Sequence, residues 1–212
     1  MTESSVPRIA GLLLGAGGSK RLGRPKQLVE FEGEALIRRA AEALMGAGCS
    51  SIVVVLGSEI EGSVQALEGL GAEIVVNDAW KSGMGSSIAC GISSIMSAAQ
   101  QVDAVLISLC DQPLVSADKL RPFVETFSHL KAGIVAAEYD GVAGVPALFS
   151  ARCFPQLAAL RGEKGAREVI RNSPDAIAIP LPEAAIDVDK MEDLEKLPSY
   201  ASRSPGNQFG PL

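Results

Sequence analysis

A short segment rich in glycine and basic residues has the composition of a phosphate-binding loop. Residues 15–18 read Gly-Ala-Gly-Gly and follow an apolar run, and Arg21 and Lys26 come soon after. Glycines allow the backbone to approach a phosphate closely with its N–H groups turned inward. The Arg21 guanidinium can hold two phosphate oxygens at once, and Lys26 adds a compact positive charge. The residues expected here are Arg21 and Lys26 as catalytic cations and Leu14, Gly15, Ala16, Gly17, Gly18 and Ser19 as binding positions.

This loop differs from two better-known phosphate-binding patterns. The Walker pattern needs a glycine, four further residues and then Gly-Lys-Ser/Thr, and it is absent. The dinucleotide pattern GxGxxG fails because Lys20 stands where the third glycine belongs. A surface turn with solvated charges is the structural alternative. The position after the first apolar run, with Arg and Lys together, favours phosphate binding.

Three aspartates could supply ligands for a metal ion. Asp111 follows the apolar run Ala104–Leu109, and Asp187 and Asp189 flank Val188. In an extended segment, both late aspartates point to one face and Val188 to the other. Mg²⁺ prefers one or two carboxylates completed by phosphate oxygens and water, and Mn²⁺ can take the same ligands. The alternatives are a turn or capping role for Asp111 and exposed charge at Asp187 and Asp189.

A second glycine-rich segment opens a predicted helix. It contains Gly83, Gly85, Ser86 and Ser87. The first N–H groups of a helix lack partners within the helix and can bind an anion. The segment is therefore a candidate binding element, with an ordinary helix N-terminus as the alternative.

The elements that must position these residues can be predicted from periodicity and turn signals. Strands are expected at Arg8–Leu14, Ile52–Leu56, Glu73–Val76, Ala104–Leu109, Gly133–Ala137, Val145–Phe149 and Ala176–Pro180. Helices are expected at Ala35–Gly48, Glu59–Leu70, Gly83–Ala99, Ser116–Leu130, residues 153–171 in two pieces, and Met191–Leu197. No linker-like composition interrupts residues 8–197, so a single domain over residues 1–198 is expected. Residues 199–212 are rich in Ser, Pro and Gly and are expected to be disordered.

Strand–helix alternation over the first 140 residues predicts an α/β fold. We expect three αβα layers around a mostly parallel, Rossmann-like sheet. Ligands bind at the carboxyl ends of the strands in such sheets. This rule selects the loops after Leu14, Val76 and Leu109 and the segment at Ile186, and the unusual residues lie in these same places.

Composition excludes several classes of protein. The net charge of −6 disfavours nucleic-acid binding, although a local cluster of four basic residues within 20–26 suits a small anionic ligand. The apolar runs are too short for a membrane span of about 20 residues. The polar N-terminus lacks the apolar core of a secretory signal, so a cytoplasmic protein is expected. The four cysteines are far apart, without any CxxC pair, which disfavours a zinc site.

Several motifs together resemble one known family. The segment Gly15–Leu28 resembles the signature loop of the MobA-like nucleotidyltransferases, most closely that of the molybdenum cofactor cytidylyltransferases. The resemblance continues, in order and with matching spacing, over roughly residues 8–197. Its further motifs are Asn77–Ser87, Cys110–Pro113, Gly144–Phe149, Gly162–Arg167 and Ile186–Asp189.

The resemblance implies a Mg²⁺-dependent transfer of CMP from CTP to the phosphate of a molybdopterin-type cofactor, with release of pyrophosphate. It implies that Asp111 and a late acidic residue, for which we choose Asp189, hold the metal, with Asp187 in support or in its place. It implies that residues 83–87 contact the base or ribose. It also implies further binding positions at Pro113, Gly144 and Arg167, although an exposed helical arginine is an alternative for Arg167. A xanthine dehydrogenase-like molybdenum hydroxylase is the expected client.

An acceptor phosphate is already ionised at neutral pH, so this reaction needs no general base. The single histidine, His129, is therefore predicted to be a surface or packing residue. The alternatives are a transferase for another NTP or acceptor, of the guanylyl, sugar-phosphate or isoprenoid-phosphate type, and a non-catalytic carrier of molybdenum cofactor. A dehydrogenase-type dinucleotide domain is disfavoured by the incomplete GxGxxG.

Overall fold

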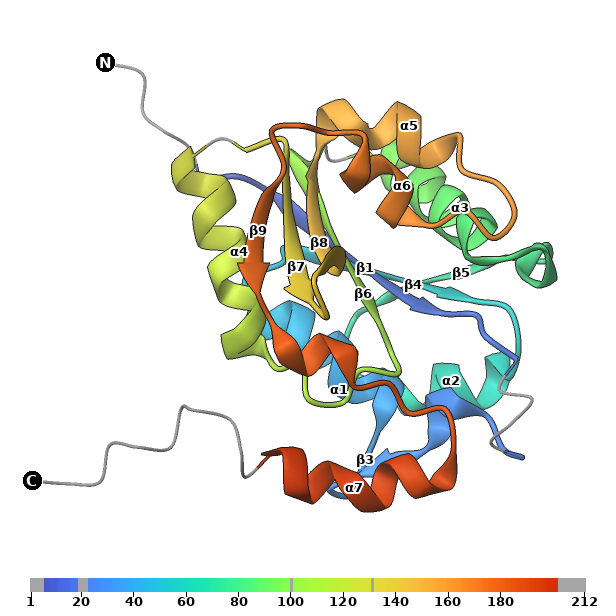
Figure 1. Cartoon of the computed structure of the whole chain (residues 1–212). Coiled ribbons are helices and arrows are strands. Elements are labelled where there is room, and N and C mark those ends of the chain that lie inside the picture. Colours follow the sequence, from blue (N-terminus) through green and yellow to red (C-terminus); the bar gives the residue numbers. More distant parts are fainter. Residues whose placement is uncertain (1–5, 19–22, 100, 131, 202–212) are drawn as a thin grey trace, which may run out of the picture.

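A seven-stranded sheet forms the centre of the computed structural model, which describes residues 6–18, 23–99, 101–130 and 132–201 (Figure 1). The strand order is β5-β4-β1-β6-β8-β7-β9. Strand β8 is antiparallel to β6 and β7, and the other neighbours in the sheet are parallel. The strands are β1 (Ile9–Gly15), β4 (Ser51–Leu56), β5 (Glu73–Val76), β6 (Ala104–Leu109), β7 (Ile134–Tyr139), β8 (Val142–Ser150) and β9 (Ile177–Pro180).

Helices cover both faces of this sheet (Figure 1). They are α1 (Leu36–Gly46), α2 (Ile60–Ala66), α3 (Met84–Ser97), α4 (Ala117–Leu130), α5 (Phe154–Ala158), α6 (Ala166–Arg171) and α7 (Met191–Ala201). Short 3₁₀ helices occur at Lys26–Leu28, Trp80–Ser82, Ala151–Cys153 and Pro182–Ala185. Within the described chain, no helix combines the length and the apolar character needed to cross a membrane.

Each face of the sheet has its own apolar core. Successive residues of a strand point to opposite faces, so Leu13 of β1 packs in the core with α1 and α4, while Leu12 packs in the core with α3. Both side chains are fully buried. Burial on both faces explains why the central strands are continuous apolar runs rather than alternating ones. The predicted three-layer α/β fold is confirmed.

A third, smaller core joins the end of the chain to an early hairpin. Strands β2 (Glu30–Phe31) and β3 (Glu34–Ala35) form this two-stranded hairpin. Val188 and Leu197 pack with Phe31 of β2 and with Leu36 at the start of α1. Figure 1 shows α7 lying beside β3 and below α1. This contact brings the late acidic segment to the same end of the sheet as the glycine loop.

The observed elements match the predicted ones closely, with two differences. The hairpin β2–β3 is absent from the sequence-based prediction, which assigns no strand between Leu14 and the first helix. Helix α7 continues through Ala201, three residues into the stretch 199–212 for which composition predicts disorder. Leu197, fully buried in the third core, anchors the last turns of this helix. Residues 202–212 lie outside the described part of the chain.

Candidate active site

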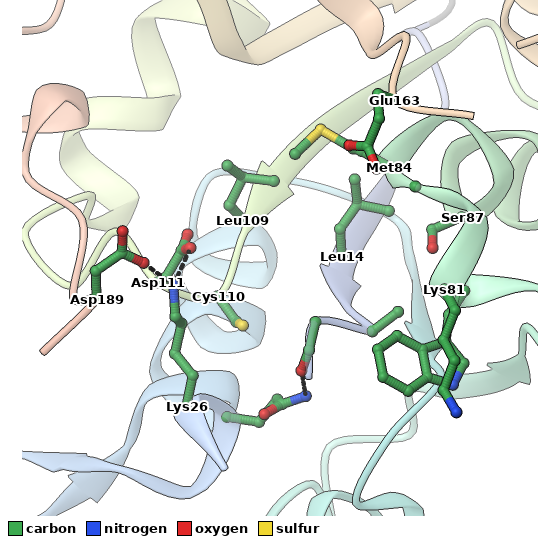
Figure 2. Close-up of a pocket in the computed structure, with 15 residues that line it drawn as sticks. Leu14, Lys26, Lys81, Met84, Ser87, Leu109, Cys110, Asp111, Glu163 and Asp189 are labelled. Carbon is green, nitrogen blue, oxygen red and sulfur yellow. Dashed lines mark hydrogen bonds and ion pairs between the residues drawn. The ribbon is translucent and has the colours of Figure 1, made fainter. Parts of the chain in front are cut away.

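A cleft of about 840 Å³ opens at the carboxyl ends of β1 and β6 (Figure 2). The loops after β1, β5 and β6 form its walls, together with single residues from the loop before α6 and the segment before α7. This is the end of the sheet that the strand rule predicts. The lining residues are Leu14, Ala16, Gly17, Lys26, Gln27, Trp80, Lys81, Gly83, Met84, Ser87, Leu109, Cys110, Asp111, Glu163 and Asp189.

Lys26 bridges two carboxylates at one end of the cleft. Its Nζ donates to Asp111 Oδ2 at 2.9 Å and to Asp189 Oδ1 at 2.6 Å, as Figure 2 shows. Only 17% of the Lys26 side chain is exposed to solvent. Burial by itself lowers the pKa of Lys26, but the charges of Asp111 and Asp189 and their hydrogen bonds outweigh it and raise the pKa above its ordinary value. Lys26 is therefore a permanent cation in the free protein.

Backbone and capping contacts fix the position of Asp189. The Val188 N–H donates to the carbonyl oxygen of Asp111 at 2.9 Å, which ties the late segment to the loop after β6. Val188 is fully buried, whereas Asp187 is exposed and Asp189 is half-buried. Asp193 Oδ2 accepts hydrogen bonds from the backbone N–H groups of Asp189 at 3.0 Å and Lys190 at 2.8 Å. The sequence correctly separates Val188 from its two acidic neighbours.

Asp111 and Asp189 have the chemistry of a site for a hard divalent cation. Asp111 Oδ1 is buried and has no hydrogen-bond partner among the described residues. No group of three or more His, Cys, Asp or Glu side chains in the described ranges is arranged to hold a metal. Two carboxylates completed by substrate phosphates are what Mg²⁺ commonly uses. The residues present therefore fit a cation that arrives with a phosphorylated ligand.

Asp187 lies beside this pair but does not line the cleft. Lost hydration, together with the negative charges of Asp111 and Asp189, raises the pKa of Asp187 to about 6, against the opposing effects of Lys26 and Gln112. Its carboxyl is thus easier to protonate than an ordinary aspartate. The geometry favours Asp189 over Asp187 as the partner of Asp111.

A buried glutamine shapes the glycine loop. Gln27 Nε2 donates to the carbonyl oxygens of Gly15 at 2.5 Å and Gly17 at 3.0 Å, and Ser58 Oγ donates to the same Gly17 oxygen at 2.9 Å. In a trans peptide unit the C=O and N–H groups point in opposite directions. The N–H groups of Ala16 and Gly18 therefore point away from Gln27. Gln27 belongs to the signature loop, but its type alone did not indicate this role.

The second glycine-rich segment is held by close backbone packing. A Cβ atom on Gly83 or Gly85 would collide with the backbone of residues 161–164. The Gly85 N–H donates to Gly162 O at 2.9 Å. Asn77 Nδ2 donates to Ser86 Oγ at 2.9 Å and Ser87 Oγ at 3.0 Å. Gly83 and Ser87 line the cleft, whereas Gly85 and Ser86 are not among its lining residues.

Among the described residues, five further predicted site positions lie outside the cleft lining, namely Gly15, Gly18, Pro113, Gly144 and Arg167. The Arg167 guanidinium stacks on the Tyr139 ring at 5.8 Å and lies beside Gly144, where a Cβ would be 3.2 Å from Arg167 Nε. Pro113 O accepts a hydrogen bond from Arg39 Nε at 2.9 Å. Ser19 and Arg21 lie outside the described residues. Trp80, Lys81 and Glu163 also line the cleft. They lie within the family motifs Asn77–Ser87 and Gly162–Arg167 but were not predicted as site residues.

Comparison with known proteins identifies the family. Residues 11–177, more than half of the chain, match the MobA-like NTP transferase domain. The chain belongs to the MobA-like NTP transferase family. The resemblance seen in the sequence motifs is thereby confirmed.

Two curated relatives of this MobA-like protein have different names. Nicotine blue oxidoreductase from Paenarthrobacter nicotinovorans is 33% identical over 209 residues, which cover 93% of this chain and 100% of that protein. The protein named probable molybdenum cofactor guanylyltransferase from Opitutus terrae is 30% identical over 117 residues, which cover 54% of each. One relative is thus named for guanylyl transfer to molybdenum cofactor, and the other has the name of an oxidoreductase.

Solved structures share the MobA-like fold. Rv0371c from Mycobacterium tuberculosis H37Rv superposes with a TM-score of 0.76 at 24% identity, covering 91% of this chain and 98% of that chain. The complex of the same protein with manganese has a TM-score of 0.72 at 23% identity, covering 90% and 97%. These similarities establish the fold.

Proposed function

We propose that this MobA-like protein transfers CMP from CTP to the phosphate of a molybdopterin-type molybdenum cofactor and releases pyrophosphate. The observation that carries the proposal is the triad of Lys26, Asp111 and Asp189 beside the glycine loop. It combines a half-buried cation, two convergent carboxylates and a backbone suited to phosphates in one cleft. Such a set suits attack by a phosphate oxygen on the α-phosphorus of an NTP.

Asp111 and Asp189 are the residues that would hold a divalent metal ion, either Mg²⁺ or Mn²⁺. The buried Asp111 Oδ1, which has no hydrogen-bond partner in the described part of the chain, supports this assignment. The manganese complex of Rv0371c, a protein of the same fold, also supports it. When bound, such an ion neutralises charge on the NTP phosphates and on the departing pyrophosphate.

Lys26 and the glycine loop would orient the triphosphate. Lys26 pairs with both carboxylates in the free protein and offsets part of their negative charge. Its ammonium can pair instead with a phosphate oxygen when those carboxylates are otherwise engaged. The N–H groups of Ala16 and Gly18 point away from Gln27 and are suited to donate hydrogen bonds to phosphate oxygens. Arg21 would contribute a second cation from the same loop. Catalysis would therefore rest on positioning and charge neutralisation.

The reaction requires no general base in the cleft, because the acceptor phosphate is already ionised at neutral pH. The single histidine agrees with this scheme. His129 is exposed in the last turn of α4 and does not line the cleft.

The choice of CTP rests on the Ala16-Gly17 pair, which resembles the cytidylyl branch of the family. Residues 83–87 are proposed to contact the base or ribose, with Ser87 facing the cleft. Pro113, Gly144 and Arg167 are proposed for the acceptor side. GTP or another phosphorylated acceptor is the alternative within the same chemistry. The client would be a xanthine dehydrogenase-like molybdenum hydroxylase in the cytoplasm.

An oxidoreductase is a second candidate function, favoured by one observation. The relative named nicotine blue oxidoreductase is 33% identical and is covered over its whole length. Against this candidate, the chain lacks a complete GxGxxG loop, and the carboxylate pair has no evident part in hydride transfer. A third candidate is a carrier that binds molybdenum cofactor without turnover.

The deciding experiment measures pyrophosphate release with Mg²⁺ or Mn²⁺ and each of CTP, GTP, ATP and UTP, with and without molybdopterin-type cofactor. Release that requires both CTP and cofactor, and is lost in Asp111→Ala, is the expected result. Asp118→Ala is the matched control, because its carboxylate is 85% exposed on α4. Release with another NTP would reassign the base.

Two other outcomes would overturn the transferase proposal. Cofactor binding without release from any NTP would favour the carrier. Oxidation of a reduced nicotinamide cofactor that survives in Asp111→Ala would favour the oxidoreductase.

A further inference from the structure

We propose that Trp80 is a positioning residue that packs against the glycine loop and fixes its conformation for phosphate binding. This inference rests on the proposed function, in which the loop holds the NTP phosphates. Trp80 is half-buried, lines the cleft and is the single tryptophan of the chain.

The indole occupies space that two glycines leave open. A Cβ atom on Gly18 would lie 2.8 Å from Cη2 and 2.9 Å from Cζ3 of Trp80, closer than real contacts allow. A Cβ atom on Gly57 would overlap the Cβ and Cγ atoms of the same side chain. Neither Gly18 nor Gly57 has a positive φ in the left-handed region. These two positions therefore require glycine because of the tryptophan, not because of the backbone conformation.

The turn that carries Trp80 is firmly attached to the sheet and to α3. The Trp80 N–H donates to Asn77 O at 3.1 Å, and the Gly83 N–H donates to Trp80 O at 3.2 Å. Asn77 in turn donates its own N–H to Leu56 O at 2.8 Å, at the end of β4. Its buried side chain binds the two serine hydroxyls at the start of α3. These hydrogen bonds hold the turn that carries Trp80 against the end of β4 and the start of α3.

The glycine loop is consequently held from two directions. Gln27 and Ser58 bind the carbonyl oxygens of Gly15 and Gly17, and Trp80 packs on Gly18. A loop without large side chains has few contacts of its own that could fix it. Trp80 supplies such a contact and leaves the N–H groups available to a ligand.

The kinetic consequence follows from this arrangement. Trp80→Ala should raise the KM for the NTP by about tenfold, because a loop that is out of place by a fraction of an ångström binds phosphates poorly. Trp80→Phe should restore part of the affinity, because its smaller ring keeps part of the contact. An unchanged KM in Trp80→Ala would contradict the proposal.

Fluorescence of the single tryptophan gives a readout that does not depend on turnover. Gly18→Ala should shift the emission to longer wavelength, because the added methyl group displaces the indole toward water. Gly17→Ala is the matched spectroscopic control, since a Cβ there has no atom within 4 Å. Inorganic pyrophosphate should also change the emission of the wild-type protein, whereas cytidine alone should not.

The outcomes separate the inference from the proposed function. Equal emission from Gly18→Ala and Gly17→Ala would overturn the packing of Trp80 on the loop, whatever the protein binds. Calorimetric binding of pyrophosphate without any change in emission would overturn the coupling between Trp80 and the phosphate site. Absence of pyrophosphate binding would count against the proposed function and against a phosphate-positioning role, but a shift in Gly18→Ala alone would still establish the packing contact.

Discussion

Lys26 keeps two carboxylates together that would otherwise repel each other. Asp111 and Asp189 both approach its ammonium within 3 Å. The ammonium is a compact charge on a flexible stem, so it can turn from a carboxylate to a phosphate with little change elsewhere. The same residue therefore stabilises the free protein and remains available to a ligand.

Replacing Lys26 tests this double role. Lys26→Ala should lower the rate of pyrophosphate release on the order of a hundredfold or more, as expected for a positioned cation at developing charge. Steady-state assays with CTP would measure the loss. Lys164→Ala, at an exposed lysine before α6 that pairs with Glu168 of that helix, is the control and should keep its rate. A loss of less than threefold in Lys26→Ala would remove Lys26 from the catalytic machinery.

Asp187 should make the metal-free protein less stable as the pH rises. Its pKa is raised to about 6 in the folded state, from an ordinary value of 3.8, so the folded protein holds this proton more tightly than the unfolded chain does. The stability that comes from this tighter proton binding is fully present below about pH 4 and is lost as the pH rises from 4 to 6. The Asp187→Asn variant lacks this pH-dependent contribution to stability.

Urea unfolding of both proteins from pH 4 to 7 would measure the effect. The free energy of unfolding of Asp187→Asn, relative to wild type, should increase between pH 4 and 6 and then stay level. Because the residue is exposed, solvent screening should keep the gain to about 1 kcal/mol or less. A difference that does not vary with pH would contradict the assignment.

Some of these residue roles were predictable from sequence and others were not. Asp111 and Lys26 could be selected because each follows a predicted strand at the ligand-binding edge of the sheet, and Asp189 because its segment resembles a motif of the family. Gln27 and Trp80 could not, because their roles depend on contacts with Gly17, Gly18 and Gly57 that only the folded chain creates.

Helix α7 and the residues before it form the element that completes the site. Asp193 in the first turn accepts hydrogen bonds from the backbone N–H groups of Asp189 and Lys190. These two hydrogen bonds lower the pKa of Asp193 below its ordinary value. One carboxylate thus caps the helix and also orients the backbone of Asp189.

Asp193→Ala should lower the free energy of unfolding at pH 7 by about 1 kcal/mol, the usual cost of a lost helix cap. The difference should shrink as the pH falls below about 4, because the lowered pKa confers stability only while Asp193 is ionised. The affinity for Mn²⁺ should fall as well. Glu192→Ala, an exposed residue of the same turn, is the control. An unchanged Mn²⁺ affinity would show that the hydrogen bonds of Asp193 do not affect the metal site.

The strands were predicted from their apolar runs, but the hairpin β2–β3 was not. Each of its strands has two residues, too few to show alternation. Its turn uses Glu32 and Gly33, both with positive φ. Asn-Gly or Asp-Gly is the usual sequence of such a turn, so Glu-Gly gives a weak signal. The surface against which α7 packs could therefore not be predicted from the sequence.

At the scale of the whole molecule, the sheet order brings distant segments to one edge. Strands β1 and β6 are neighbours, so the loops with Lys26 and Asp111 meet. The positions of Arg167 and Pro113 depend on how α6 and the loop after β6 pack, and this packing leaves them outside the cleft lining. Their predicted roles would require an acceptor that extends beyond the cleft.

Ligand binding should stabilise the whole fold through this cleft. With Mn²⁺ and CTP at 100 times the dissociation constant, the gain should be about 2.7 kcal/mol. For a protein of this size, that corresponds to a rise in melting temperature of roughly 5–10 °C. Scanning calorimetry should show the rise in wild type and in Asp118→Ala but not in Asp111→Ala. An equal rise with GTP would remove the preference for cytosine.

The closure of α7 on the hairpin also has a consequence for synthesis on the ribosome. Lys26 and Asp111 leave the exit tunnel well before Asp189, which comes near the end of the chain. Until residues 186–197 have emerged, the nascent protein lacks the second carboxylate and the helix that orients it. A ribosome that stalls before this point leaves a chain with all seven strands of the sheet and an unfinished cleft. The complete cleft therefore forms only after residues 186–197 have left the ribosome.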